Sequence, residues 1–521
     1  MVVEIILALC PFILPLVAAI VGYAASRIGD NARNGGIILV MIAALIINSI
    51  LVLESNLGIF SPVELGAIIV NESGIFVSEL VIILSLLVIV YSIRYMSVER
   101  DSTLYYVLIC IFTGTMIGLI FSFNLIILYM FVEASTVTSA ILVMYGRTRR
   151  ANRAAIIYLA ISILGGFFIL GAEFVLVSAS GVESIVDPAM LAVSADIRLI
   201  ASILMIVGFG VKAGVIPFGF IWLPRAHADA PSPISALLSG VLVQVAAFAM
   251  IRTVGVIAFD IQAVSIILIV FGVGSMLSGS LSALFEVYGL KLINYTFSRD
   301  IKRVLAYSTI SEIGFIVMIG GLQGLFGPFS PPAEFSALAA MLLHLYNHGL
   351  SKALLFLSVG VIMYYLHIRD IGQLGGLYNS MPITATSFLI GALSLGMVPP
   401  LLGYKTIFEL AFEITVPLAI NIFLILSVVT IGITLAFYLS AFLFIFIRPR
   451  PQYALGDINL DAAKMTPPPR VKLYQPLPMI FPVLFILLVI IALGVLFISG
   501  ILSSSVLNLE RIAFTVINPG L

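Results

Sequence analysis

The sequence predicts an all-α integral membrane protein with about fourteen transmembrane helices. Only 10% of its 521 residues are charged, 62% are hydrophobic, and the mean hydropathy is +1.23. Soluble domains carry about 25% charged residues, and no water-soluble fold could bury so much apolar surface. Apolar runs of about 20 residues, long enough to cross a bilayer as a helix, recur along the chain.

The predicted spans follow from these runs. In chain order they lie at 4–25, 36–54, 76–96, 103–122, 124–145, 153–178, 199–221, 232–254, 261–284, 303–322, 335–365, 383–412, 418–446 and 476–502. The first run follows Glu4 rather than basic residues, so we expect a retained helix and not a cleaved signal.

The basic residues test this topology independently. Most of the 25 Lys and Arg residues lie in odd-numbered connections or at the span ends beside them. The even-numbered side, with the C-terminal tail, has only Arg198, Arg252 and Arg511. Because cytoplasmic loops are rich in Lys and Arg, we expect a multi-pass protein of the cell membrane with both termini outside.

The spans also divide into repeats. Spans 4 to 8 and 9 to 13 form two groups of five, and an odd number of helices would make the second group an inverted copy of the first. Prolines fall at matching places, Pro217 and Pro224 in span 7 and Pro399 and Pro400 in span 12, so we expect broken helices there. The predicted units are N-terminal helices at 1–100, repeats at 101–255 and 256–448, a cytoplasmic linker at 449–475, and a last helix at 476–521.

Ionisable residues inside spans are costly, so each requires a partner or a function. Glu133 in span 5 and Lys212 in span 7 form the obvious candidate pair, either for proton transfer or as a static ion pair. In span 12, Lys405 and Glu409 are four residues apart and can pair on one face. Glu173 and Glu312 are weaker candidates near the span ends.

Span 11 carries a polar stripe. His344, His348 and Lys352 recur every four residues, so their side chains share one helix face about 12 Å long. Imidazoles and a desolvated lysine are the groups that a proton relay requires. Two histidines at this spacing could bind a metal, but no carboxylate or cysteine adjoins them, and Lys352 would repel a cation.

Redox cofactors are not expected in this chain. Cys10 and Cys110 lie inside apolar runs without a CxxC partner, so neither an iron–sulfur cluster nor a zinc site can be built from them alone. The formal net charge of zero argues against a basic nucleic-acid-binding domain. Any redox chemistry, with iron–sulfur or other cofactors, is expected on partner subunits.

Four motifs resemble a known family. They are KAGVIP at 212–217, LPRAHADAPSPISALLSG at 223–240, DIKRVLAYSTIS at 300–311, and the segment 344–360. With these residues the chain is similar to the antiporter-like subunits shared by respiratory complex I, Mrp-type sodium/proton antiporters and membrane-bound energy-converting hydrogenases. The second motif is highly specific, and the similarity extends through spans 4 to 13.

The resemblance implies roles for several residues. It implies a fourteen-helix fold with inverted five-helix repeats and broken helices 7 and 12. It identifies Glu133 and Lys212 as the helix-5 glutamate and helix-7 lysine of a proton path. His344, His348 and Lys352 match the helix-11 positions, and His227, within the second motif, is a secondary candidate.

Two positions depart from the family pattern. Many members have a lysine four residues after the Ser239–Gly240 pair, where this chain has the neutral Gln244. The usual ionisable residue of helix 12 is replaced by Ile407, with Lys405 and Glu409 on either side. The proton path is therefore expected to be rerouted here or lost.

The sequence therefore predicts a proton- or ion-translocating membrane subunit of a redox-driven complex, complex I-like or hydrogenase-like. Expected partners are other membrane subunits, including further antiporter-like ones, a peripheral redox arm, the lipid bilayer, and protons or sodium, but no nucleic acid. The alternatives are a component of an Mrp-type sodium/proton antiporter and a non-conducting scaffold.

Overall fold

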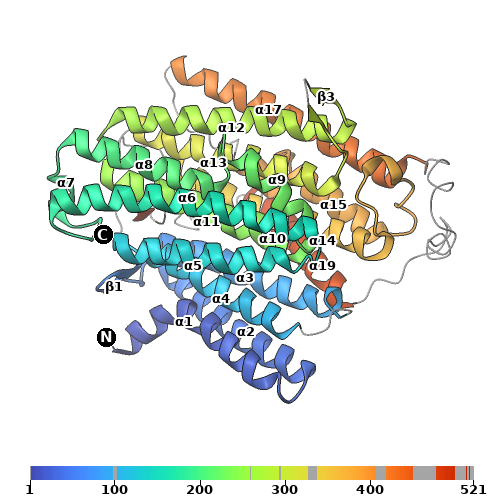
Figure 1. Cartoon of the computed structure of the whole chain (residues 1–521), viewed down its shortest axis with the longest axis horizontal. Coiled ribbons are helices and arrows are strands. Elements are labelled where there is room, and N and C mark those ends of the chain that lie inside the picture. Colours follow the sequence, from blue (N-terminus) through green and yellow to red (C-terminus); the bar gives the residue numbers. More distant parts are fainter. Residues whose placement is uncertain are drawn as a thin grey trace.

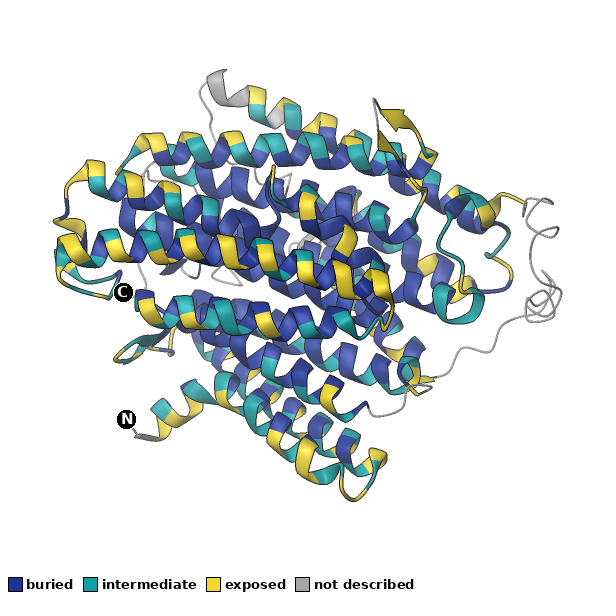
Figure 2. Ribbon diagram, viewed as in Figure 1, coloured by how far each residue is buried: buried dark blue, intermediate teal, exposed yellow. Residues whose placement is uncertain are grey.

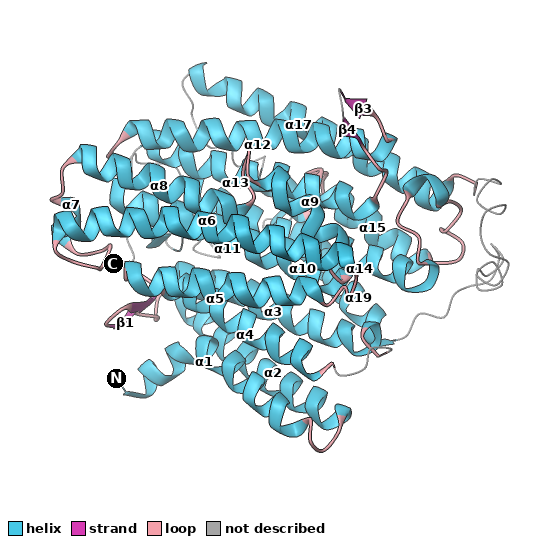
Figure 3. Cartoon of the chain, viewed as in Figure 1, coloured by secondary structure: helices cyan, strands magenta, loops and turns pink. Residues whose placement is uncertain are grey.

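The computed structural model describes residues 2–97, 102–258, 260–292, 295–326, 337–406, 418–449, 477–498, 512 and 515–516. Long helices lie side by side in one bundle (Figure 1), and strands occur only as two short hairpins within these residues (Figure 3). The predicted all-α membrane fold is confirmed.

The first part of the bundle runs from the N-terminus to the end of helix α7. Its elements are α1 (Val2–Ala25), α2 (Asp30–Asn56), β1 (Val63–Leu65), β2 (Ile68–Val70), α3 (Glu72–Tyr95), α4 (Thr103–Phe121), α5 (Leu125–Met144), α6 (Arg149–Ser180) and the short α7 (Pro188–Leu191).

The middle of the chain contains α8 (Ala195–Ala213), α9 (Gly219–Asp229), α10 (Ser232–Leu237), the π-helical turn η1 (Leu238–Leu242), α11 (Val243–Ala258) and α12 (Gln262–Tyr288). The last part contains β3 (Lys291–Leu292), β4 (Tyr295–Thr296), α13 (Ile301–Phe326), α14 (Ala337–Leu366), η2 (Ile371–Gln373), α15 (Pro382–Leu395), α17 (Leu418–Phe442), η3 (Leu443–Ile447) and α19 (Leu477–Ile498).

Twelve helices of the described residues are long and apolar enough to cross a membrane. The predicted spans 199–221 and 383–412 are not among them, and a break interrupts each. In the first, α8 ends at Ala213 and α9 begins at Gly219; in the second, α15 ends at Leu395 and the chain is helical again at 402–406. A cis peptide bond to proline, at Pro217 or Pro400, lies in each break.

Predicted span 232–254 is also irregular. A π-helical turn at Leu238–Leu242 separates α10 from α11, and this whole segment is buried at the centre of the bundle (Figure 2). Gly240 lies in the turn, and a β-carbon there would be only 3.1 Å from the Gly349 carbonyl of α14. The missing side chain lets the two backbones approach, and π-helical turns are frequent at functional sites.

The periphery of the bundle is apolar. Helices α1 and α2 are largely exposed on one edge, whereas α3, α13 and the segment 232–258 are almost entirely buried (Figure 2). In a membrane the exposed aliphatic side chains face lipid or partner subunits.

Two β-hairpins were not among the predicted elements. Strands β1 and β2 pair antiparallel from Val63–Val70 to Leu65–Ile68 across a tight turn at Gly66, whose φ of +59° suits glycine. Strands β3 and β4 pair at the other end of the bundle (Figure 3). The strands are two or three residues long, too short for a recognisable alternation of apolar and polar residues.

The placement of one arginine differs from the prediction. Arg252, assigned by the sequence to a span end, is fully buried in α11. Its guanidinium donates to the carbonyls of Ile120, Leu119 and Ser122, where α4 ends, and lies 4.3 Å from the Phe123 ring centre. The last carbonyls of a helix have no partner within it, so Arg252 satisfies them in place of water.

Candidate functional site

The first candidate centre is Lys212, in the last turn of α8 before the break. Its side chain is buried, with 2% of its surface exposed. The ammonium nitrogen donates to the Val132 carbonyl at 2.5 Å and to the Thr136 hydroxyl, both on α5. A charge this deep in a membrane protein requires such acceptors, and the carboxyl end of α8 adds a favourable dipole.

Glu133 lies on α5 between the two Lys212 acceptors in sequence, but it does not contact the lysine directly. No hydrogen bond or ion pair joins Glu133 and Lys212 within the described part of the chain, and Glu133 Oε1 has no hydrogen-bond partner there. Gly166 of α6 makes room for this carboxylate, because a β-carbon at Gly166 would overlap Glu133 Oε1. Glu133 therefore acts on Lys212 electrostatically rather than as a closed ion pair.

The break after Lys212 is held by an aromatic pair. Trp222 of α9 donates from Nε1 to the Val211 carbonyl at 2.9 Å and packs on Tyr158 with ring centres 4.6 Å apart. Tyr158 in turn shares a 2.7 Å hydrogen bond with Ser139. These contacts satisfy a backbone group freed by the break and fix the end of α8 that carries Lys212.

The second candidate centre is Lys352, on α14. It is fully buried and donates to the Leu305 carbonyl at 3.2 Å, to the Ser308 hydroxyl, and to the Tyr438 hydroxyl at 3.1 Å. The Ser308 and Tyr438 hydroxyls are 2.9 Å apart, so α13 and α17 together provide one acceptor cluster. Sequence reasoning did not identify Tyr438, because a tyrosine in an apolar span is unremarkable.

The other two residues of the span-11 stripe differ in their contacts. His344 Nε2 lies 3.0 Å from Glu312 Oε2 of α13, so a weaker sequence candidate proves to be the partner of a stronger one. Among the described residues, neither ring nitrogen of buried His348 has a hydrogen-bond partner. The titratable groups that act on His348 are Lys352, His344 and His227. His227 is likewise buried with both nitrogens unpaired, and it stacks on Phe356 at 5.2 Å.

Gln244 lies on α11 and faces α14. In the orientation that satisfies its amide, it donates to the Leu345 carbonyl at 3.0 Å and accepts from the Gly349 amide at 2.7 Å. The side chain is buried and held by the α14 backbone on either side of His348 in sequence. Gln244 is therefore not packed among apolar groups only. Among the described residues, no continuous series of hydrogen bonds connects it to Lys212.

The helix-12 candidates are only partly described. Lys405 is half-buried in the segment after the break, whereas Glu409 and Ile407 lie outside the described residues, so their predicted arrangement stays a prediction. The break itself is held by Asn347 of α14, which donates to the Ser394 carbonyl at 3.2 Å and accepts from the Ser394 hydroxyl at 2.6 Å.

One buried cation was missed by sequence reasoning. Lys302, treated as a basic residue at a span end, is fully buried and donates to the Ala230 carbonyl. Arg369 pairs with Asp229 and Asp300, each at 3.1 Å, and all three act on the charge of Lys302. The signal that could have found this cluster is the joint presence of Asp229, Asp300 and Lys302 in the family motifs.

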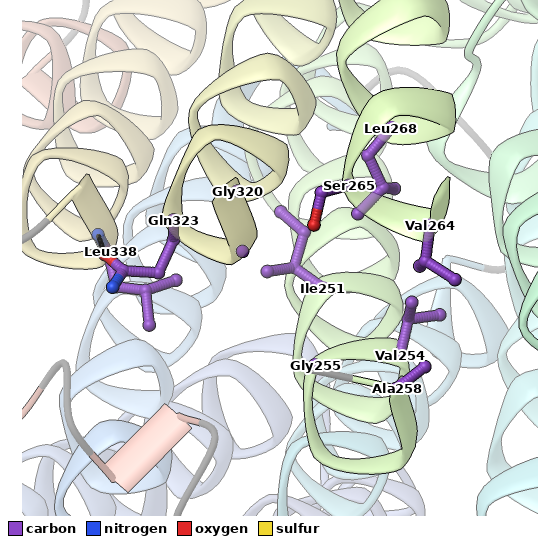
Figure 4. Close-up of a pocket in the computed structure, with 11 residues that line it drawn as sticks. Ile251, Val254, Gly255, Ala258, Val264, Ser265, Leu268, Gly320, Gln323 and Leu338 are labelled. Atoms are coloured by element: carbon purple, nitrogen blue, oxygen red, sulfur yellow. Dashed lines mark hydrogen bonds between the residues drawn. The ribbon is translucent and has the colours of Figure 1, made fainter. Parts of the chain in front are cut away.

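The described residues contain no group of three or more His, Cys, Asp or Glu that could hold a metal ion. A cavity of about 40 Å³ lies between α11, α12, α13 and the start of α14 (Figure 4). Its lining is mostly aliphatic side chains and glycine, with Ser265 and Gln323 as polar members, and it includes none of the predicted site residues.

Comparison with known families matches residues 122–434 to the family described as NADH:quinone oxidoreductase/Mrp antiporter, TM. A Na(+)/H(+) antiporter component of Alkalihalophilus pseudofirmus is 35% identical over 327 residues, covering 61% of this chain and 39% of that protein. Hydrogenase-4 component B of Escherichia coli is 34% identical over 297 residues, covering 56% of this chain and 42% of that protein. The chain thus spans about two fifths of the length of these curated relatives.

Two solved complexes contain chains of the same fold. The Mrp complex from a Dietzia species matches with a TM-score of 0.80 and 21% identity over 100% of this chain and 98% of that chain. The archaeal membrane-bound sulfane sulfur reductase matches with a TM-score of 0.80 and 19% identity over 98% of this chain and 97% of that chain.

Proposed function

The chain belongs to the NADH:quinone oxidoreductase/Mrp antiporter transmembrane family, and from this premise we propose that it translocates protons as an antiporter-like membrane subunit of a redox-driven complex. Its activity, substrates and partners are the subject of this proposal.

One observation supports the proposal most strongly. Two buried lysines, Lys212 and Lys352, are each held by hydroxyl and carbonyl oxygens of neighbouring helices, and neither contacts a carboxylate among the described residues. Neutral acceptors hold an ammonium weakly, so such a lysine can release and regain a proton with little rearrangement. A static role would favour a close ion pair, as Arg198 forms with Asp260 at the edge of the bundle.

In the proposed path each predicted repeat carries one of the two lysine centres, Lys212 in 101–255 and Lys352 in 256–448. Glu133 tunes Lys212, and the His344, His348 and Lys352 stripe carries protons in the second repeat, with Lys405 and Glu409 at its far end. The amide of Gln244 cannot carry a proton, so water beside it would connect Lys212 to His348. His227, which lies within electrostatic range of Lys302 and Lys352, would provide the entry from the predicted cytoplasmic side.

The proposed partners follow from the cysteine content of the sequence. Two separate cysteines cannot build an iron–sulfur cluster, so the redox groups would lie on a peripheral arm. Further antiporter-like subunits would complete the complex in the cell membrane. The predicted topology has both termini outside.

The specific alternative is an Mrp-type sodium/proton antiporter, favoured by the names of several relatives. The second alternative, a non-conducting scaffold, is favoured by the backbone contacts of Gln244.

The decisive experiment is to purify the complex that contains this chain, identify its partners by mass spectrometry and reconstitute it in proteoliposomes. We expect a cofactor-bearing partner and proton uptake that depends on electron transfer. Proton exchange driven by a sodium gradient, with membrane partners only, would establish the Mrp-type alternative.

A parallel variant tests whether this chain conducts. Lys212→Met should assemble normally and abolish ion-coupled turnover. Undiminished pumping by Lys212→Met would instead support the scaffold role.

A further inference from the structure

Glu173 is a buried carboxyl group that the path described above does not use. It lies on α6, about two turns before the helix ends at Ser180, and only 3% of its surface is exposed. Helix α6 has one exposed face (Figure 2), on which Phe167 and Phe174 are strongly exposed, so the buried Glu173 points into the bundle.

Within the described residues, neither carboxyl oxygen of Glu173 has a hydrogen-bond partner. A structural carboxylate in this protein looks different. Glu286, also buried, accepts on Oε1 from the Ser298 amide at 3.1 Å, the Ser298 hydroxyl at 2.6 Å and the Asp300 amide at 3.0 Å. An ionised carboxylate without partners in an apolar bundle costs several kcal/mol, so Glu173 is expected to hold a proton at rest.

The position of Glu173 connects it with the first lysine centre. Gly166 is seven residues earlier on α6, which places both residues on one helix face about 10 Å apart along the axis. A β-carbon at Gly166 would overlap the Glu133 carboxylate and lie 3.5 Å from the Tyr129 ring. Tyr129, one turn from Glu133 on α5, lies within electrostatic range of both Glu133 and Glu173.

We propose that Glu173 is a second proton-carrying carboxyl of the first repeat, which exchanges protons with Glu133 by way of Tyr129 on the membrane side where α5 begins and α6 ends. The protonated Glu173 first releases its proton to water on that side and becomes a carboxylate. Protonated Glu133 then gives its proton to the Tyr129 oxygen while the Tyr129 hydroxyl proton passes to the Glu173 carboxylate. This returns Glu173 to its protonated state and leaves Glu133 ionised, and no other reactant is required. The inference rests on the proposed function of the chain.

Transport by reconstituted variants provides the first test. Glu173→Gln keeps the shape of the side chain but cannot exchange a proton, so proton uptake should fall at least about tenfold with normal assembly. Glu183→Gln is the matched control, because Glu183 lies on the same membrane side but is exposed and accepts from Asn124 at 2.9 Å. Tyr129→Phe should reduce uptake in the same direction. If Glu173→Gln takes up protons like the wild type while Lys212→Met is inactive, the proposed role of Glu173 would be overturned and the proposed function of the chain would stand.

Chemical labelling provides a test that does not depend on transport. A hydrophobic carbodiimide reacts with protonated carboxyl groups in apolar surroundings, and peptide mass spectrometry of the intact complex would locate the adduct. We expect a label on Glu173 and none on Glu183. An unlabelled Glu173 in a preparation whose Glu133 is labelled would contradict a protonated Glu173. This result would hold whether or not the chain pumps protons.

Discussion

The two lysine centres differ in how their charge is balanced. Lys212 has one carbonyl and one hydroxyl acceptor, and the nearest carboxylate in sequence to those acceptors, Glu133, has an oxygen without a hydrogen-bond partner in the described structure. Lys352 has one carbonyl and two hydroxyl acceptors. The carboxylate that acts on its charge, Glu312, lies within hydrogen-bond distance of His344. In the proposed path the first centre would therefore respond to movement of a carboxylate, whereas the second would act as a more fixed relay.

The largest effect is expected from closing the space that Glu133 occupies. Gly166→Ala would place a methyl group on the Glu133 carboxylate and disturb only the first lysine centre. Proton uptake should therefore fall about a hundredfold. Gly171→Ala on the same helix is the control, because its only close neighbour would be Leu204 at 4.0 Å within the described residues. Equal uptake by the two variants would show that the position of Glu133 is unimportant.

A smaller effect is expected at the carboxylate of the second centre. Glu312→Gln removes the charge paired with His344 but keeps its shape, so uptake should fall roughly tenfold, less than for Gly166→Ala. Measurement in the reconstituted complex, with the exposed Glu64→Gln as control, checks this order. A Glu312→Gln variant more damaged than Gly166→Ala would reverse the proposed assignment of the flexible and fixed centres.

The hydroxyl partners allow a finer comparison. Thr136→Val removes the hydroxyl acceptor of Lys212, whereas Tyr438→Phe leaves Lys352 with Ser308. Loss of one acceptor of a buried donor costs about 1–3 kcal/mol, so we expect Thr136→Val to slow uptake about tenfold and Tyr438→Phe about fivefold. Tyr288→Phe, at an exposed tyrosine bonded to Ser440, should change nothing. The reverse order of the first two variants would count against the difference between the centres.

The smallest effect is expected at an ion pair outside the path. Arg198 donates to both carboxylate oxygens of Asp260, at 2.6 and 2.7 Å, and this contact holds the pKa of Asp260 below its ordinary 3.8. The pair therefore stabilises the fold fully above that pH and loses its contribution as the pH falls through the lowered pKa. Because Asp260 is exposed, Asp260→Asn should cost less than about 1 kcal/mol at pH 7, and proton uptake should be unchanged. Thermal unfolding of the wild type and Asp260→Asn in detergent, at neutral and acidic pH, would measure this cost. A loss of stability well above 1 kcal/mol at pH 7 would contradict the prediction.

Much of the fold follows from the sequence. Apolar runs long enough to cross a membrane predict most of the observed helices, and the prolines at 217 and 399–400 mark the two interrupted ones. The hairpins were not predictable, because strands of two or three residues carry no periodic signal.

The site is only partly predictable. The sequence identifies Lys212 and Lys352 because a charge in an apolar run is conspicuous. The sequence cannot show that Lys212 binds Thr136 rather than Glu133, since this depends on how closely α8 packs against its neighbouring helices, α6 among them. Gly165 and Gly208 set this packing: a β-carbon on Gly165 would lie 2.9 Å from the Gly208 carbonyl. A neutral partner such as Tyr438 cannot be recognised from the sequence, because a tyrosine in an apolar helix is common.

We propose that Lys212 and Lys352 act in series on one proton path. Proton uptake in proteoliposomes should be compared for Lys212→Met, Lys352→Met and the double variant, at equal amounts of assembled complex. We expect each single variant to abolish uptake and the double variant to be no worse, because the effects of residues that act as a unit are not additive. Substantial uptake by either single variant, with a further loss in the double variant, would contradict it and indicate two separate routes.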